Sequence, residues 1–450
     1  MGRLFGTDGA RGVANTELTA ELAVSIGRAA AMVLTENAEK EHSTILIGKD
    51  TRLSSDMLEG ALVAGLCSFG ADVILLGAVP TPAVAYLVRK YGADAGFMIS
   101  ASHNPFEFNG IKIFAGTGYK LPDKMEERIE AIILDGLEEL PVPTGSGLGR
   151  VRKAENAVQD YIDHVAETVS FPLDGMEIAI DCSNGSASRT AQELFTKLGA
   201  KCHMLSAEPD GININENCGS THMENLQKFV REHDLDGGVA FDGDADRCLA
   251  VDENGELLDG DCIMAICALD LSSRGLLSKK TAVGTVMSNL GFQRFCADND
   301  LSFVATGVGD RYVLESMLEN GYNFGGEQSG HVIFLDHSTT GDGQLTAAQL
   351  LSTANRRKEK LSGLARIMTH YPQVLMNVRV SPEGKKQYPD NKAIADKINS
   401  VEETLGDNGR VLVRPSGTEP LLRVMLEGLD LSEIRGYAQE IVDVIEKEIG

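Results

Sequence analysis

Three carboxylates stand at alternate positions in the segment Asp242-Gly243-Asp244-Ala245-Asp246-Arg247. The apolar runs on either side predict two strands joined by a tight turn. In such a turn the three side chains can converge on one cation, and an all-oxygen ligand set favours Mg²⁺ or Ca²⁺. A helix–loop–helix calcium site is a poor match, because Arg247 stands where that loop needs Gly. The alternative, a solvated acidic turn, would leave three close carboxylates repelling one another.

A second candidate site follows the apolar segment 95–99, which predicts a strand. The next residues are Ser100-Ala101-Ser102-His103-Asn104-Pro105. Because α/β proteins place their chemistry at the carboxyl ends of strands, Ser102 is a candidate nucleophile or phosphoryl carrier, with His103 beside it. The alternative is an ordinary hydroxyl-capped turn or helix N-cap. A GxSxG motif is missing here, which argues against a Ser-His-Asp esterase.

Two more loops could bind an oxygen-rich ligand. The run Arg414-Pro415-Ser416-Gly417-Thr418-Glu419-Pro420 combines two hydroxyls, a cation and a flexible Gly, with Arg423 nearby. These groups can cradle a phosphate, although hairpin turns often carry Ser-Gly-Thr for turn geometry alone. In the Gly-rich segment 325–331, Glu327 and Ser329 could hydrogen-bond adjacent sugar hydroxyls. His331 by itself is more typical of a buried core histidine.

The elements that must position these loops show a repeated pattern. A strand, a polar turn and a helix follow one another in three places, beginning near residues 45, 176 and 280. The first two helices are predicted over 57–70 and 187–198. This cadence is typical of parallel β-α-β units and predicts three related α/β domains with mixed sheets, followed by a small α+β domain. The expected domains span residues 1–150, 151–255, 256–368 and 369–450.

Composition excludes several classes of protein. The 450 residues include 41 Lys and Arg against 66 Asp and Glu, a net charge of −25. This charge argues against binding to nucleic acid or to anionic membranes, and an anionic substrate would need a local positive pocket. No apolar run is long enough for a membrane helix, and the N-terminus lacks a signal-peptide core. The eight cysteines are scattered without a CxxC pair, so we expect free thiols in the cytoplasm.

Taken in order, the serine, aspartate, Glu327 and Arg414 loops resemble those of the α-D-phosphohexomutase superfamily, over the whole chain. The segments 5–12, 217–222 and 327–331 are most similar to bacterial members that act on glucosamine phosphates. The resemblance implies four domains around a central cleft and a homodimer formed through the first domain.

The resemblance also implies a role for each loop. Ser102 would be the phosphoserine of the active enzyme, and it would hold one Mg²⁺ per chain together with Asp242, Asp244 and Asp246. Glu327 and Ser329 would bind sugar hydroxyls. The non-reacting phosphate would be bound by Arg414, Ser416, Gly417, Thr418 and Arg423. The reaction centre would be lined by Arg11, His103, Lys112, Arg247 and His331.

The implied reaction interconverts glucosamine 6-phosphate and glucosamine 1-phosphate through a glucosamine 1,6-bisphosphate intermediate, which is also the activator. This reaction would feed amino-sugar nucleotide and peptidoglycan synthesis. Lys112 and His331 are both candidates for the general base, and the C-terminal domain is expected to move on a hinge near residues 362–372. The alternatives are a mutase for glucose or mannose phosphates, a serine-dependent phosphatase, and a non-catalytic protein that binds sugar phosphate or calcium.

Overall fold

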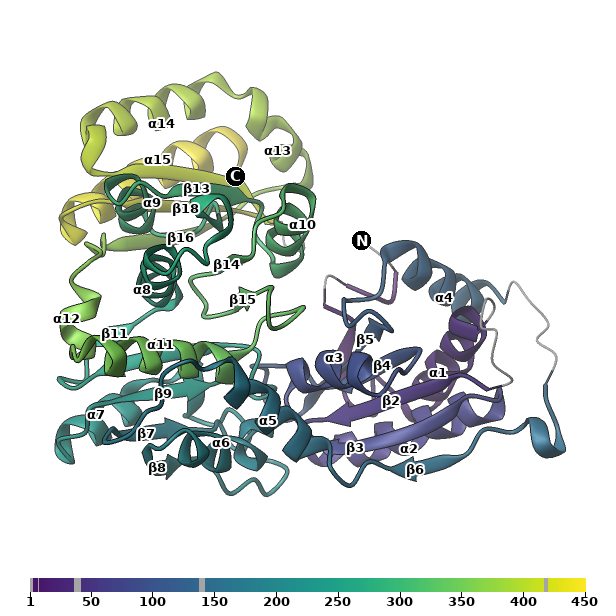
Figure 1. Cartoon of the computed structure of the whole chain (residues 1–450). Coiled ribbons are helices and arrows are strands. Elements are labelled where there is room, and N and C mark those ends of the chain that lie inside the picture. The colour runs from purple at the N-terminus through teal and green to yellow at the C-terminus, as the bar shows by residue number, and fades with distance from the viewer. Residues whose placement is uncertain (1–2, 7, 36–41, 137–141, 417–419) are drawn as a thin grey trace. The chain divides into compact units, whose positions relative to one another are not determined.

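The computed structural model describes residues 3–6, 8–35, 42–136, 142–416 and 420–450 (Figure 1). The chain forms two compact units. The larger unit comprises Met1–Met287 and Leu301–Ile367, and the smaller one comprises Ser288–Asp300 and Met368–Gly450. The division at residue 367 falls within the range where the sequence predicts a hinge.

The larger unit contains three sheets with their covering helices. The first part of the chain forms β1 (Ala10–Val13), α1 (Ala20–Thr35), β2 (Thr44–Lys49), α2 (Leu53–Ser68), β3 (Asp72–Ala78), α3 (Thr81–Lys90), β4 (Ala95–Ile99), β5 (Phe108–Ala115), α4 (Asp123–Asp135) and β6 (Val151–Lys153). The second part forms α5 (Ala157–Thr168), β7 (Glu177–Asp181), α6 (Ala191–Lys197), β8 (Lys201–Leu205), α7 (Glu224–Glu232), β9 (Gly237–Phe241), β10 (Cys248–Asp252) and β11 (Leu257–Leu258). The third part forms α8 (Gly260–Ser273), β12 (Thr281–Thr285), β13 (Ser302–Thr306), α10 (Asp310–Asn320), β14 (Phe324–Gly326), β15 (Val332–Phe334), α11 (Gly343–Arg357) and α12 (Leu361–Ala365).

The three sheets share one strand order, which confirms the predicted repeat. Within them lie the runs β3-β2-β4-β5, β8-β7-β9-β10 and β13-β12-β14-β15. In each run the first three strands are parallel and the fourth is antiparallel to its neighbour. The connection into that fourth strand is too short for a helical crossover, so the chain must reverse direction there. These three reversals carry the serine, aspartate and Glu327 loops.

The strands that precede these reversals are apolar on both faces. Every residue of β4 and of β9 is buried, as expected for central strands covered by helices on both sides. The helices α1 and α2 pack against the first sheet with an apolar cluster that includes Ile26, Leu62 and Phe97. A rigid sheet therefore fixes the starting point of each functional loop.

The smaller unit is the predicted α+β domain with one added helix. It forms α9 (Leu290–Asp298), β16 (Gln373–Arg379), α13 (Pro382–Gln387), α14 (Lys392–Leu405), β17 (Arg410–Pro415), β18 (Leu421–Glu427) and α15 (Leu431–Ile449). Its antiparallel sheet has the order β16-β18-β17 and packs against α15. The structure groups Ser288–Asp300 with this unit as well. The boundaries of the four predicted domains stay predictions, since the structure divides the chain into two units only.

Two helix predictions need correction. The helix predicted over 57–70 runs from Leu53 to Ser68, and the one predicted over 187–198 divides into a 3₁₀ turn, Ser186–Arg189, and α6.

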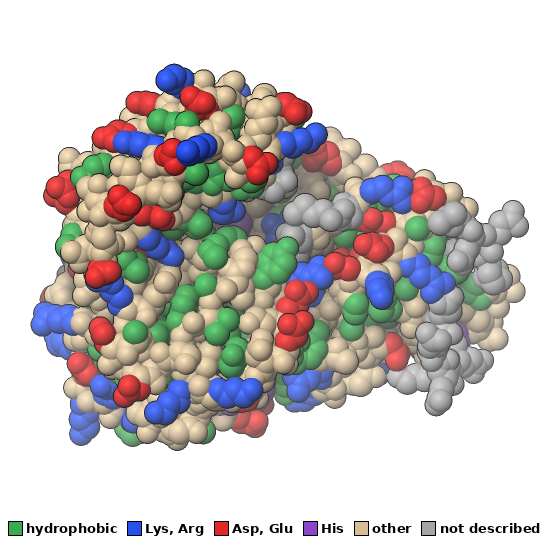
Figure 2. Space-filling model, turned by 90° about the horizontal axis from the view of Figure 1, so that it is seen from above, with side chains coloured by type: hydrophobic (Ala, Val, Ile, Leu, Met, Phe, Trp, Pro, Cys, Tyr) green, Lys and Arg blue, Asp and Glu red, His purple; other side chains and the backbone are tan. Residues whose placement is uncertain are grey.

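Within the described ranges, no helix has the length and apolar character needed to cross a bilayer. On the face drawn in Figure 2, acidic and basic side chains are interspersed over the surface.

Candidate active site

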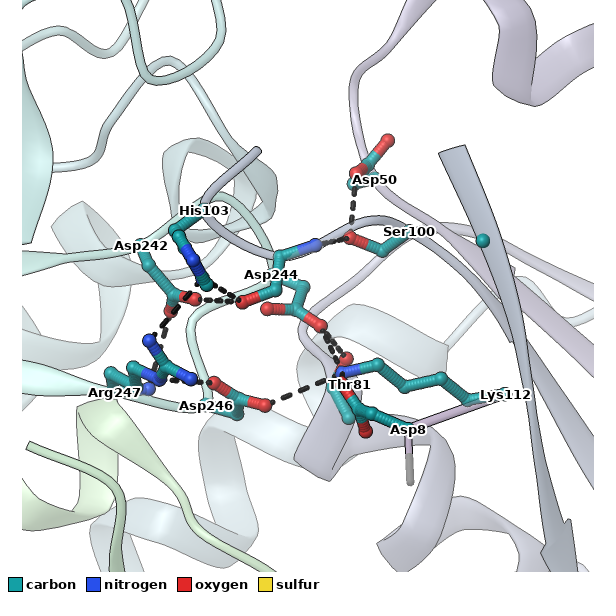
Figure 3. A network of polar contacts seen from close by, with 12 residues as sticks. Asp8, Asp50, Thr81, Ser100, His103, Lys112, Asp242, Asp244, Asp246 and Arg247 are labelled. Carbon is teal, nitrogen blue, oxygen red and sulfur yellow. Dashed lines mark hydrogen bonds and ion pairs between the residues drawn. The ribbon is translucent and has the colours of Figure 1, made fainter. Parts of the chain in front are cut away.

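The serine loop and the aspartate loop meet in the larger unit, although they lie far apart in the chain (Figure 3). The Ser102 hydroxyl donates a hydrogen bond to Asp242 Oδ2 at 2.6 Å, and both residues are buried. His103 Nδ1 lies 3.3 Å from Ser102 Oγ and 3.3 Å from a guanidinium nitrogen of Arg247. Because a guanidinium can only donate, His103 Nδ1 is the acceptor in that contact.

The three aspartates form the metal-type cluster that the sequence predicts. Asp242, Asp244 and Asp246 are buried, and one oxygen from each lies within 4.8 Å of the others. Asp244 Oδ1 and Asp246 Oδ1 accept no hydrogen bond from the described residues, and the guanidinium of Arg247 lies 3.9 Å from Asp246 Oδ1. Buried carboxylate oxygens without partners are costly unless a cation neutralises them. The donor set therefore fits a hard divalent cation such as Mg²⁺.

The electrostatics of this cluster is uneven. Burial, together with the charges of Asp246 and Asp244, raises the pKa of Asp242 well above its usual range. Burial also opposes ionisation of Asp244, but Lys112 and a hydrogen bond from Thr81 outweigh it and lower the pKa of Asp244 to about 2. Burial and the nearby Arg247 lower the pKa of His103, so its imidazole is neutral at pH 7.

Lys112 supplies the cation inside this cluster. Its Nζ atom lies 2.9 Å from Asp244 Oδ2, 3.2 Å from Asp8 Oδ2 and 3.5 Å from Asp246 Oδ2. Burial alone would lower the pKa of Lys112, but these carboxylates raise it above its ordinary value. The side chain is therefore protonated throughout the neutral pH range.

Replacing Lys112 with Met should lower the free energy of unfolding of the metal-free protein by about 3–5 kcal/mol, because it leaves buried carboxylates without their counter-charge. Urea unfolding in the presence of a chelator measures this loss. The matched control is Lys201→Met, which removes an exposed ion pair with Glu177 and should cost less than about 1 kcal/mol. Equal losses of unfolding free energy in the two variants would contradict the role of Lys112 as the counter-charge of the buried carboxylates.

A cavity of about 440 Å³ opens beside the cluster. Its lining includes six residues singled out in the sequence: Arg11, Asp246, Arg247, Glu327, Ser329 and His331. Glu327 Oε1 accepts a hydrogen bond from Gly309 N at 3.1 Å, while Ser329 is exposed. Two cations and a set of hydroxyl and carboxylate groups around one cavity suit a sugar phosphate.

His331 is buried at the wall of this cavity. Neither of its ring nitrogens has a hydrogen-bond partner among the described residues, and Nε2 lies 3.7 Å from Asp310 Oδ2. Gly341 packs flat against the ring, since a Cβ atom there would come within 2.4 Å of Nε2. The ring is thus held in place, and neither nitrogen is committed to a hydrogen bond with a described residue.

The predicted phosphate loop joins β17 to β18 in the smaller unit. Arg414 and Arg423 are cross-strand neighbours, and burial together with Arg423 lowers the pKa of Arg414. Arg414 Nε is buried without a hydrogen-bond partner in the described part of the chain. Ser416 is buried beside Lys385, whose Nζ donates to its carbonyl. Gly417 and Thr418 lie outside the described residues.

Several residues in the site were not identified from the sequence. Asp8 accepts from Lys120 at 2.8 Å and pairs with Arg11 and Lys112, and Lys120 also binds Asp310 at 2.7 Å. Thr81, at the start of α3, donates to Asp244 Oδ2 at 2.6 Å. Asp8 lies in segment 5–12, which carries part of the family resemblance, so that segment could have identified Asp8 as a site residue. The contacts of Thr81 and Lys120 depend on tertiary structure and leave no local pattern.

Family models match nearly the whole chain. Those for domains I, II, III and the C-terminal domain of phosphoglucomutase/phosphomannomutase match residues 2–139, 159–255, 259–371 and 375–444.

Curated relatives and solved structures agree with the family models. The chain is 57% identical to phosphoglucosamine mutase of Acetivibrio thermocellus over 100% of both chains, and 54% identical to that of Clostridium novyi over 100% of this chain and 99% of the relative. A phosphoglucomutase/phosphomannomutase family protein from Burkholderia thailandensis has the same fold, with a TM-score of 0.83, 24% identity and coverage of 100% and 99%. An N-acetylphosphoglucosamine mutase from Aspergillus fumigatus, solved with GlcNAc-6P and magnesium, has a TM-score of 0.69 at 17% identity, with coverage of 99% and 96%. The chain therefore belongs to the phosphoglucomutase/phosphomannomutase family, and its curated relatives named above are phosphoglucosamine mutases.

Proposed function

We propose that the protein interconverts glucosamine 6-phosphate and glucosamine 1-phosphate through a phosphorylated Ser102. The observation that carries this proposal is the buried hydrogen bond between the Ser102 hydroxyl and Asp242, within a cluster suited to a divalent cation. The names of the curated relatives favour glucosamine over glucose or mannose. The cytoplasmic location, the homodimer through the first domain and the domain boundaries stay predictions.

In the first half-reaction the bond between phosphorus and Ser102 Oγ breaks and a bond to the C1 oxygen of the sugar forms. The C1 hydroxyl proton passes to a general base. The product is glucosamine 1,6-bisphosphate. The bisphosphate then turns round within the cleft. In the second half-reaction the bond between phosphorus and the C6 oxygen breaks, the protonated base returns its proton to that oxygen, and the phosphoryl group bonds to Ser102 Oγ again.

We assign the general base to His331 and the charge-stabilising role to Lys112. His331 lines the cavity and neither of its ring nitrogens is hydrogen-bonded to a described residue, whereas Lys112 is protonated and surrounded by carboxylates. A permanently protonated ammonium can balance negative charge but cannot accept a proton. Arg11 and Arg247, which line the cavity, supply further donors, and His103 lies against Arg247.

Mg²⁺ would be held by Asp242, Asp244, Asp246 and an oxygen of the phosphorylated Ser102. When bound, it would neutralise charge on the phosphoryl oxygens. Glu327 and Ser329 would orient the sugar hydroxyls. Arg414, Ser416, Gly417, Thr418 and Arg423 would bind the phosphate that does not react.

³¹P NMR of the protein with Mg²⁺ and a trace of the matching 1,6-bisphosphate tests the proposal. Glucosamine 6-phosphate, glucose 6-phosphate and mannose 6-phosphate are offered in separate samples. We expect glucosamine 1-phosphate to appear much faster than the other products. Faster turnover of glucose or mannose phosphate would move the substrate assignment, release of inorganic phosphate would indicate a phosphatase, and no turnover would contradict the mutase.

Replacing Arg414 with Gln should raise KM for glucosamine 6-phosphate about tenfold with a smaller change in kcat. It removes a charge-assisted hydrogen bond, and tenfold corresponds to about 1.4 kcal/mol. Steady-state kinetics measures both constants. Arg435→Gln, at an exposed position of α15, is the control. An unchanged KM in Arg414→Gln would remove this arginine from the phosphate site.

A further inference from the structure

Ser102 has a backbone conformation that its surroundings must impose. Its φ angle is +52°, in the left-handed region, where a residue with a side chain costs of order 1 kcal/mol or more. This conformation directs Oγ toward Asp242. Something in the fold therefore holds the serine loop against its own preference.

The residue that contacts this loop most extensively is Arg52, which lies between β2 and α2 and is completely buried. Its NH2 group donates to the carbonyl oxygens of Ser102 at 2.9 Å and Asn104 at 2.8 Å. Its NH1 group donates to the carbonyl oxygens of Pro105 and of Phe108, the latter at 3.1 Å. With Nε bound to Asp50 at 2.8 Å, every N–H direction of the guanidinium is used.

Asp50 connects Arg52 to the other side of Ser102. Its carboxylate accepts from Ser55 Oγ at 2.9 Å and from Ser100 Oγ at 2.7 Å, and Ser100 Oγ accepts from the Ser102 N–H at 2.9 Å (Figure 3). The peptide groups before and after Ser102 Cα are thus tied to one buried ion pair. Such networks are rigid when every member is satisfied.

The second domain adds a matching contact. Asn215 Nδ2 donates to the carbonyl oxygens of Ser102 at 2.9 Å and Asn104 at 3.0 Å. Gly243 of the aspartate loop lies so close that a Cβ atom there would come within 2.6 Å of the Ser102 carbonyl oxygen. The carbonyl side of the serine loop is therefore packed and hydrogen-bonded, while the hydroxyl faces the aspartates.

This arrangement has an electrostatic consequence for phosphoryl transfer. The negative ends of the loop's peptide dipoles point at a buried positive charge, so they are directed away from Ser102 Oγ and the anionic group it would carry. Had the carbonyl oxygens faced the phosphoryl group, they would repel it in a site shielded from water.

We propose that Arg52, held by Asp50, is a positioning residue for phosphoryl transfer by Ser102. It fixes the left-handed turn and keeps the carbonyl oxygens of the serine loop away from the transferring group. This inference rests on the proposed mutase function.

The test compares Arg52→Lys with wild type in the mutase assay, at saturating bisphosphate and well below each unfolding midpoint. An ammonium has three donors without the planar fork, so it cannot reach the same four carbonyl oxygens. We expect kcat to fall about 100-fold, the usual cost of misplacing a reacting group by about 1 Å. KM for glucosamine 6-phosphate should change less than about threefold, because the sugar-binding groups are untouched.

Arg274→Lys is the matched control, since Arg274 also pairs with an aspartate, Asp270, at 3.1 Å but is exposed, directly after the end of α8. Its kcat should equal that of wild type. If Arg52→Lys does not fold, Asp50→Asn keeps the shape of the carboxylate, removes its charge and should lower kcat about tenfold, as expected for one charged hydrogen bond.

A folded Arg52→Lys variant with wild-type kcat and only a lowered unfolding midpoint would overturn the inference, because Arg52 would then be merely structural. Wild type that fails to isomerise any of the sugar phosphates would instead overturn the proposed function, and this inference with it.

Discussion

Ser102→Ala should abolish sugar-phosphate isomerisation, with a loss of about 10⁴-fold or more in kcat, because it removes the atom that carries the phosphoryl group between the two positions of the sugar. The substrate-binding groups stay in place, so glucosamine 6-phosphate should still stabilise the variant in a thermal unfolding assay. ³¹P NMR measures turnover, and intact-mass analysis after incubation with the 1,6-bisphosphate measures phosphorylation.

The matched control is Ser25→Ala, which removes a hydroxyl that donates to the Glu21 carbonyl within α1. It should keep wild-type kcat and wild-type phosphorylation. Ser100, whose hydroxyl donates to Asp50, lies only two residues from Ser102. Peptide mapping must therefore establish which of the two serines carries the phosphate. Full isomerase activity in Ser102→Ala, or a phosphate on the variant in wild-type amount, would exclude the proposed carrier.

The parts of the fold that local pattern predicts well are those whose signals lie next to each other in the chain. Helix α15 is an example, since it begins after an Asp430 side chain that accepts from the backbone N–H groups of Ser432 and Glu433. The turn between β9 and β10 was found in the same way, because its three aspartates follow a completely buried strand. A capping residue or an apolar run needs no distant partner to be recognised.

The two misplaced helices have local causes of a different kind. Helix α2 begins at Leu53, four positions before the apolar pattern does, because the one apolar side chain of its first turn, Leu53, is 69% exposed and the buried residue there is the polar Ser55. The helix predicted over 187–198 is interrupted at Thr190, where φ is −127° and ψ is −37°. Neither feature leaves a periodic signal, so boundaries were predicted less well than elements.

The residues of the site also fall into those with a local sequence signal and those without one. Ser102 and the aspartates stand in recognisable local motifs, whereas the residues that hold them act across long separations. Thr81 reaches Asp244 over 163 positions, and Arg52 reaches the Ser102 carbonyl over 50. Arg52 lies in the short turn between β2 and α2, but a single arginine in a polar turn resembles many exposed ones. Only the packing of the first two sheets shows that it is buried.

Removal of divalent metal should stop turnover. The Asp242→Asn variant should lose both the activity that depends on the metal and the stability that the metal adds, and the two losses are measured separately. We expect the variant to lose about 10³-fold in kcat, since a neutral amide binds the cation more weakly than a carboxylate does and does not keep the charge balance of the cluster. Adding Mg²⁺ at about 100 times its Kd should stabilise wild type by about 2.7 kcal/mol and the variant by much less. Chelator titration and thermal unfolding measure these effects, with the exposed Asp163→Asn as control.

In the absence of metal, the Asp242→Asn variant should be more stable than wild type at pH 7. The folded protein raises the pKa of Asp242 well above its usual range through burial and the charges of Asp246 and Asp244. Its protonated form therefore favours folding at low pH, and that contribution is lost as pH rises from about 4, the ordinary carboxyl pKa, toward the raised value. The amide introduced by Asp242→Asn does not ionise, so the metal-free variant should match wild type at low pH and exceed its free energy of unfolding by about 1 kcal/mol or more at pH 7. A variant less stable than metal-free wild type at pH 7, or one that keeps the full Mg²⁺ stabilisation, would show that Asp242 is not part of a self-repelling metal cluster.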